Sequence, residues 1–70
     1  MNANDAIKIL ARRDGNEPVF LLLGSDPAGE AATRKYAAVV SLKGDNTKED
    51  CRKIDDALET ADAMRLWPKT

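Results

Sequence analysis

Apolar stretches of the chain are separated by three clusters of turn-forming residues, which divide the sequence into four pieces. The clusters read "RDGNEP", "GSDP" and "KGDNT", and each is rich in the Gly, Pro, Asp and Asn residues typical of turns. The four pieces differ in the spacing of their apolar residues. That spacing predicts a mainly α-helical chain with one short, apolar extended segment near its start.

The first piece, "NDAIKILARR", predicts a short helix over Ala6–Arg13. Asn4 or Asp5 would cap its start, and two arginines followed by an Asp-Gly pair suit the negative end of a helix dipole and a glycine stop. A β-hairpin is the alternative, because two isoleucines flank a lysine and Asp-Gly between apolar runs is a hairpin signal.

The second piece, "PVFLLL" at residues 18–23, is apolar without alternation. Its Val and Phe favour an extended chain, but six residues are too few to separate a buried strand from a buried helical turn by periodicity. A strand here would have no partner within a helical chain. Its backbone donors would then need a strand of another subunit, which favours a dimer.

The third piece predicts a helix from Pro27 to about Lys43. Asp26 is a favoured cap, Pro27 suits the first helical position, and Glu30 adds negative charge in the first turn. Gly44 is the expected stop. Apolar residues at spacings of three and four define its expected buried face, which comprises Ala28, Ala32, Tyr36, Val39 and Val40.

The fourth piece predicts a second long helix, which begins after Thr47. Asp50 follows three residues later and completes a capping box. The helix should end near Trp67, because the residue before Pro68 resists helical geometry. Its apolar stripe comprises Cys51, Ile54, Ala57, Leu58, Ala61 and Met64. Two helices joined by so few residues are expected to pack antiparallel.

The length of 70 residues predicts a single small domain over residues 1–70 with a limited core. A chain this short buries only about 60% of its unfolded surface. Cys51 is the only cysteine and the chain has no His, so neither a disulfide nor a zinc cluster is available within it. Oligomerisation is the remaining means of stabilisation, and we therefore expect a homo-oligomer.

Charge and hydropathy narrow the expected partners. Eleven basic and twelve acidic residues give a net charge of -1, so neither nucleic acid nor an anionic membrane is an expected partner. No apolar run approaches the ~20 residues of a membrane span. The start "MNANDA" lacks the basic and apolar regions of a signal peptide, and a cytoplasmic protein is expected.

The segment "GSDPAG" has the outline of a phosphate-binding loop, since it lies between an apolar run and a helix and places four residues between two glycines. Such a loop then needs a Lys and a Ser or Thr, whereas Glu30 and Ala31 follow here. Asp26 adds a second negative charge, and Pro27 removes an amide donor. The segment is therefore interpreted as a helix start.

Residues for catalysis are few. The usual general base is missing without His, and Cys51 lies on an apolar stripe, where it is interpreted as a small core residue. Asp55 and Asp56 are neighbours on a helix and point about 100° apart, so they do not form a facing carboxylate pair. We expect no enzymatic activity, no cofactor and no metal site.

Basic doublets along the helices favour a binding function. Most of them are expected to be exposed charges with carboxylate partners, since Glu30 lies one turn before Arg34. In a closed oligomer, however, copies of Arg34 around a symmetry axis would form a basic pocket that one chain lacks. Tyr36 and Trp67 combine an apolar body with a polar tip and would stack on a planar ligand, with core packing as the alternative role of Tyr36. The predicted ligand-binding residues are Arg34, Lys35, Tyr36 and Trp67.

The stretch "EPVFLLLGSDPAGEAATRKYA" followed by "ADAMRLWP" resembles a pattern in short uncharacterised reading frames of proteobacteria and their phages. The resemblance spans Glu17 to Pro68 and rests on the residues Glu17, Pro18, Phe20, Asp26, Ala61 to Met64, Trp67 and Pro68. Tyr36 stands where the pattern has a Trp in its middle helix. The resemblance implies a bacterial or phage setting and no particular activity.

Two functions are compatible with these features. The first is a homo-oligomer that captures a small anionic, nucleotide-type ligand at subunit boundaries, as a phage would use against host defence. The second is a protein-interaction module or inhibitor that presses residues 18–23, or an apolar helix face, against a host protein. A nucleotide should raise the melting temperature of the first and leave the second unchanged.

Overall fold

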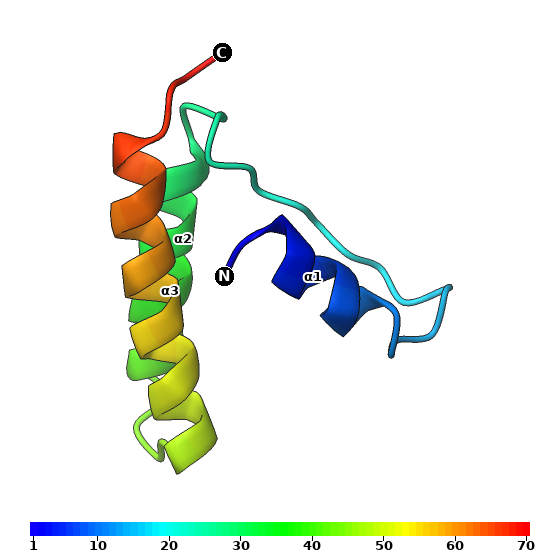
Figure 1. Ribbon diagram of the computed structural model, residues 1–70. Coiled ribbons are helices and arrows are strands. Elements are labelled where there is room, and N and C mark those ends of the chain that lie inside the picture. Colours follow the sequence, from blue (N-terminus) through cyan, green and yellow to red (C-terminus); the bar gives the residue numbers. More distant parts are fainter.

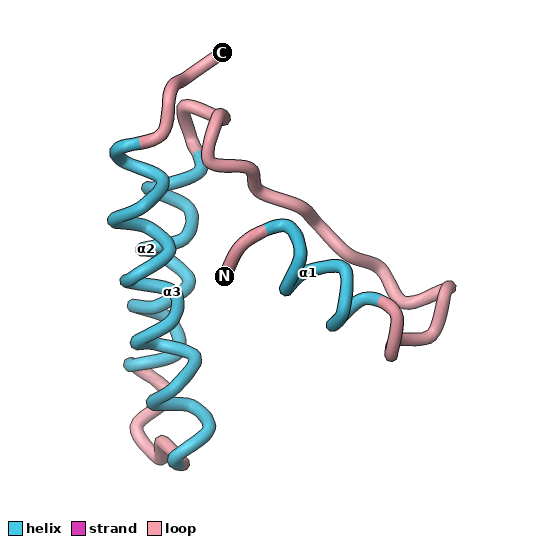
Figure 2. Tube along the Cα trace, viewed as in Figure 1, coloured by secondary structure: helices cyan, strands magenta, loops and turns pink.

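The computed structural model describes all residues from 1 to 70, and its regular structure consists of three helices. These are α1 (Ala3–Leu10), α2 (Gly29–Ser41) and α3 (Lys48–Leu66), with no strand (Figure 1). The prediction of a mainly helical chain is confirmed, and the alternative hairpin at the start does not form. Residues 18–23 belong to the long connection between α1 and α2 and form neither helix nor strand (Figure 2).

Helix α1 begins earlier than its sequence pattern predicted. Asn2 is the cap: its side chain accepts a hydrogen bond from the Asp5 amide at 3.0 Å, and the Asp5 carboxylate accepts one from the Asn2 amide at 3.3 Å. The prediction of a cap at Asn4 or Asp5 is wrong, because Asp5 occupies the third helical position of a capping box. The end is also earlier: Arg12 and Arg13 lie in a turn after Leu10, not in the helix.

Helix α2 begins two residues after the predicted start. The Asp26 carboxylate accepts a hydrogen bond from the Ala28 amide at 2.8 Å, and its carbonyl accepts one from the Gly29 amide at 3.0 Å. Asp26 and Pro27 therefore form a separate turn that leads into the helix, and no side chain caps the helix itself. At the other end the helix stops at Ser41, before a Gly44 with φ of 83°.

Helix α3 agrees closely with its prediction. The Thr47 hydroxyl accepts a hydrogen bond from the Asp50 amide, the Asp50 carboxylate accepts one from the Thr47 amide, and both distances are 3.1 Å. The predicted capping box is thus confirmed. The helix ends at Leu66, and Trp67 takes the extended backbone, φ -80° and ψ 139°, expected of a residue before proline.

Helices α2 and α3 lie side by side and antiparallel, as predicted (Figures 1 and 2). Their shared core is small, and no large side chain in it is completely buried. On α2 the inner face carries small residues at spacings of four: Gly29 and Ala37 are buried, and Thr33 between them is half-buried. The Thr33 hydroxyl donates to the Gly29 carbonyl and the Ser41 hydroxyl to the Ala37 carbonyl, so both polar groups are satisfied within their own helix.

Two predictions about buried faces are wrong. Tyr36 and Val39 of α2 are 49% and 56% exposed, because the face turned toward α3 carries the small residues instead. Ala28 is also exposed and precedes the helix, whereas Ala32 and Val40 of the predicted face are half-buried. Cys51 of α3 is exposed rather than a core residue. The buried residues of α3 are Asp50, Ala57, Ala61 and Met64. Leu58 of the predicted stripe is 40% exposed, and Ile54 is half-buried.

Helix α1 stands apart from the α2–α3 hairpin. It has no buried residue, and its backbone lies farther from α2 and α3 than these two helices lie from each other (Figure 1). The radius of gyration is 12.8 Å, compared with about 11 Å for a compact domain of this length. The result is an elongated molecule whose first third is held only loosely against the hairpin.

Candidate binding groove

An open groove lies between α1, the connection before α2, and the last turns of α3. It measures about 610 Å³ and is lined mainly by apolar side chains. We define the apolar groove by Leu21, Leu22 and Leu23 of the connection, Ala63, Met64 and Trp67 at the end of α3, and Ala3 and Ala6 of α1. Its polar lining consists mainly of hydroxyl and amide side chains, including those of Asn2, Asn4, Ser25 and Thr60.

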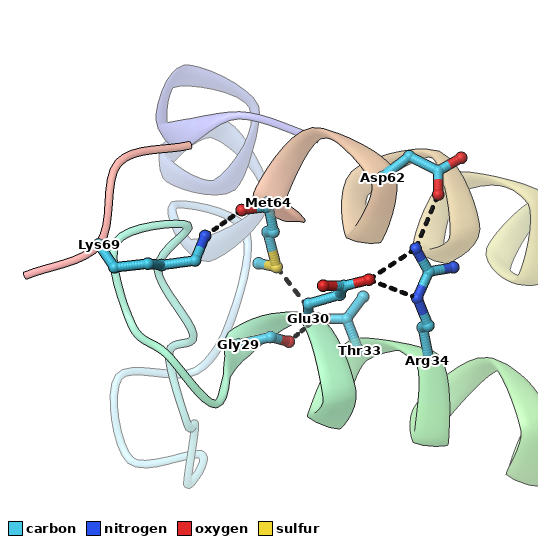
Figure 3. A network of polar contacts seen from close by, with 7 residues as sticks. All are labelled: Gly29, Glu30, Thr33, Arg34, Asp62, Met64 and Lys69. Carbon is cyan, nitrogen blue, oxygen red and sulfur yellow. Dashed lines mark hydrogen bonds and ion pairs between the residues drawn. The ribbon is translucent and has the colours of Figure 1, made fainter. Parts of the chain in front are cut away.

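The residues after α3 hold one end of the groove in place. The Lys69 ammonium donates hydrogen bonds to the carbonyls of Gly24 at 2.9 Å and of Trp67 at 2.8 Å. It also donates to the Met64 carbonyl, the bond drawn in Figure 3. The Thr70 amide donates to the Ser25 carbonyl at 3.0 Å. These bonds fasten the last residues of the chain to the turn before α2.

Two glycines allow close contacts at this end of the groove, Gly24 with Trp67 and Gly29 with the backbone of Leu23. A Cβ added at Gly24 would lie 3.3 Å from the Trp67 ring, and one added at Gly29 would lie 2.7 Å from the carbonyl oxygen of Leu23. The second distance is shorter than real Cβ contacts, and the atom in the way belongs to the backbone. Gly29 therefore sets the position of Leu23, and with it one wall of the groove.

The start of the chain holds the opposite wall. The Met1 ammonium donates to the Thr60 hydroxyl at 2.8 Å and to the Asp56 carboxylate at 3.2 Å. Both partners are on α3, so these contacts place the first turn of α1 beside that helix. The one charged group that lines the groove is thus already paired with a carboxylate.

A second polar cluster joins α2 and α3 away from the groove. The Arg34 guanidinium contacts the Glu30 carboxylate at 2.9 Å, as predicted, and also the Asp62 carboxylate at 2.7 Å (Figure 3). These hydrogen bonds, first that to Asp62 and then that to Glu30, raise the pKa of Arg34. The hydrogen bond from Arg34 lowers the pKa of Asp62. The cluster carries one positive and two negative charges, so it repels an anion.

The four residues predicted to bind a ligand are not brought together. Only Trp67 lines the groove, where its side chain is 62% exposed. Arg34 is held by two carboxylates, while Lys35 and Tyr36 are exposed on α2 and do not line the groove. One chain therefore contains no site that combines their charge with their aromatic rings.

Sequence reasoning missed most of the groove. The sequence does not indicate that Ala3, Ala6 and Ala63 line a groove, because alanines are common on any helix face. The apolar run at residues 21–23 is evident in the sequence, but its position near Trp67 is not. That position depends on the hydrogen bonds from Lys69 to Gly24 and from Thr70 to Ser25. The Trp-Pro-Lys ending was the available signal, since it places an aromatic side chain and a cation directly after a helix.

Comparisons with protein-family models, with curated proteins and with solved structures were made for the whole chain. None of them finds a match. No group of acidic or Cys side chains in the structure is arranged to hold a metal ion. None of the three helices is both long and apolar enough to cross a membrane.

Proposed function

We propose that this protein is a non-enzymatic protein-interaction module that takes apolar side chains of another polypeptide into the groove. The observation that supports the proposal is the surface around Trp67. Three large apolar side chains that line the groove are exposed, namely Leu21, Leu23 and Trp67. Phe20 and Leu66, which directly precede lining residues in the sequence, are exposed as well. An exposed apolar surface of this kind is typical of a protein-binding site.

The charges of the groove favour a polypeptide over an anion. Its single charged group, the Met1 ammonium, contacts Asp56, and the nearby Lys69 ammonium is surrounded by three backbone carbonyls. Neither cation is left to compensate a phosphate. We favour protein binding over nucleotide capture for the same reason. Nucleotide capture needs a free Arg34, whereas Arg34 forms ion pairs with Glu30 and Asp62.

Trp67 provides a direct assay, because it is the only tryptophan and lines the groove. The probe is a synthetic amphipathic helix with leucines at positions i, i+3, i+4 and i+7, and the control peptide has serines there. We expect the leucine peptide to shift Trp67 emission to shorter wavelength in a saturable way, and the serine peptide to leave it unchanged. The experiment is done at the lowest protein concentration that gives a signal.

A pair of variants assigns the response to the groove. Ala63→Glu places a charge in the groove, and Ala38→Glu places the same charge on an exposed position of α2 outside it. We expect the first variant to lose peptide binding and the second to retain it. Equal responses to both peptides, or binding retained in Ala63→Glu, would overturn the proposal. A rise in melting temperature with linear or cyclic nucleotides, without any response to the leucine peptide, would favour anion capture instead.

A further inference from the structure

We infer that the polypeptide that occupies the groove is a second copy of this chain, whose Phe20 enters the groove while its own groove receives Phe20 in return. This inference rests on the proposed function and names the partner of the same groove. It predicts a dimer with twofold symmetry, in which each copy supplies one anchor and one groove.

The exposed area of one chain supports a second copy. The accessible surface is 5750 Å², whereas a folded monomer of 7.6 kDa exposes about 4,300 Å². The excess of about 1,450 Å² is larger than the ~800 Å² that each partner contributes to an interface of standard size. Burial of much of this excess against a second copy would bring the surface of each chain to that of an ordinary folded protein.

Phe20 is the best candidate for the anchor. It is 86% exposed, more than any other large apolar side chain, and it is not part of the lining of its own groove. It is also the only Phe of the chain. Aromatic side chains of this kind provide large contact areas at interfaces and dominate their binding energy.

The position of Phe20 in the chain makes reciprocal exchange geometrically simple. Leu21, the next residue, lines the groove, so Phe20 lies at its edge. A twofold axis close to this edge would place each Phe20 beside the groove of the other copy. Electrostatic repulsion does not oppose this arrangement, because each chain has a net charge of only -1.

The test is sedimentation velocity of the full chain over a wide range of concentrations, in reducing buffer so that the exposed Cys51 forms no disulfide. We expect a monomer–dimer equilibrium. Phe20→Ser should weaken the dimer by at least about thirtyfold, as the loss of an interface anchor does. Leu42→Ser is the matched control, because Leu42 is 82% exposed but lies after α2 and outside the groove; it should weaken the dimer less than about threefold.

A second measurement locates the residues that Phe20 contacts, and its result does not depend on whether a substitution lowers the stability of the fold. A photoreactive phenylalanine analogue at position 20 should cross-link to the peptide that contains Met64 and Trp67, and mixing isotopically light and heavy chains should show that the link joins two molecules. A monomer at every concentration, or a dimer that Phe20→Ser and Leu42→Ser weaken equally, overturns the inference. If the chain is monomeric but Trp67 still responds to the leucine peptide, the groove serves another protein and only the second copy is excluded.

Discussion

Replacement of Gly29 by Ala tests whether contact between α2 and the connection before it shapes the groove. The added Cβ would lie 2.7 Å from the Leu23 carbonyl oxygen, which is closer than real Cβ contacts, so the backbone at Leu23 or the start of α2 must shift. Overpacking of this kind costs about 1–3 kcal/mol, whereas Ala in place of Gly in a helix gains at most about 1 kcal/mol. We expect a net loss of about 1–2 kcal/mol in the free energy of unfolding.

Urea unfolding followed by circular dichroism at one fixed protein concentration measures this loss. Gly15→Ala is the control, because a Cβ at Gly15 meets no atom within 4 Å and its φ is not positive. We expect that variant to be unchanged or slightly stabilised, by about 0.4–1 kcal/mol, through the unfolded state. The emission of Trp67 should shift in Gly29→Ala and stay constant in Gly15→Ala. A Gly29→Ala protein as stable as the wild type would refute the role assigned to this glycine.

Two further predictions concern α3. Thr47→Ala removes the side chain that caps α3 and should lower the free energy of unfolding by about 1 kcal/mol, as measured by thermal or urea unfolding. Thr33→Ala is the control, because the Thr33 hydroxyl bonds to a carbonyl of its own helix and caps no helix. Acid should also destabilise the fold. Hydrogen bonds from the Thr47 amide and then from the Lys43 ammonium lower the pKa of Asp50 below its usual value of 3.8, and the hydrogen bond from Arg34 lowers the pKa of Asp62 in the same way. Both carboxylates therefore stabilise the folded state above that pH. They lose this contribution as the pH falls through their pKa in the folded state. The urea midpoint should therefore fall between pH 5 and pH 3, by less in Asp50→Asn than in the wild type, and a midpoint that does not change with pH would contradict the assignment.

The parts of the fold that could be predicted are those encoded by neighbouring residues. The capping box at Thr47 and the stop before Pro68 depend on residues three positions apart or fewer, and both were located correctly. Asp26 was predicted to cap α2 directly, because a cap residue followed by proline looks the same whether the helix starts at once or two residues later. Local chemistry therefore determines the kind of element more closely than its first residue.

Long-range packing accounts for what could not be predicted. A search for apolar periodicity selected Tyr36 and Val39 as the buried face of α2, whereas the face that packs carries Gly29, Thr33 and Ala37. Small residues let two helices approach closely, and hydropathy does not register that property. The groove was equally hidden, since its walls depend on the contacts of Met1 with α3 and of Lys69 with Gly24, each joining residues more than forty positions apart.

The row of small residues on α2 has a consequence for how this sequence tolerates change. Gly29, Thr33 and Ala37 face the neighbouring helix, and the Thr33 hydroxyl already bonds to the Gly29 carbonyl of its own helix. A library that varies every position of α2 should therefore retain almost any residue at the outward positions, Tyr36 and Val39 among them, and only the smallest residues along this row. Side-chain volume, rather than hydrophobic character, would be the quantity under selection there.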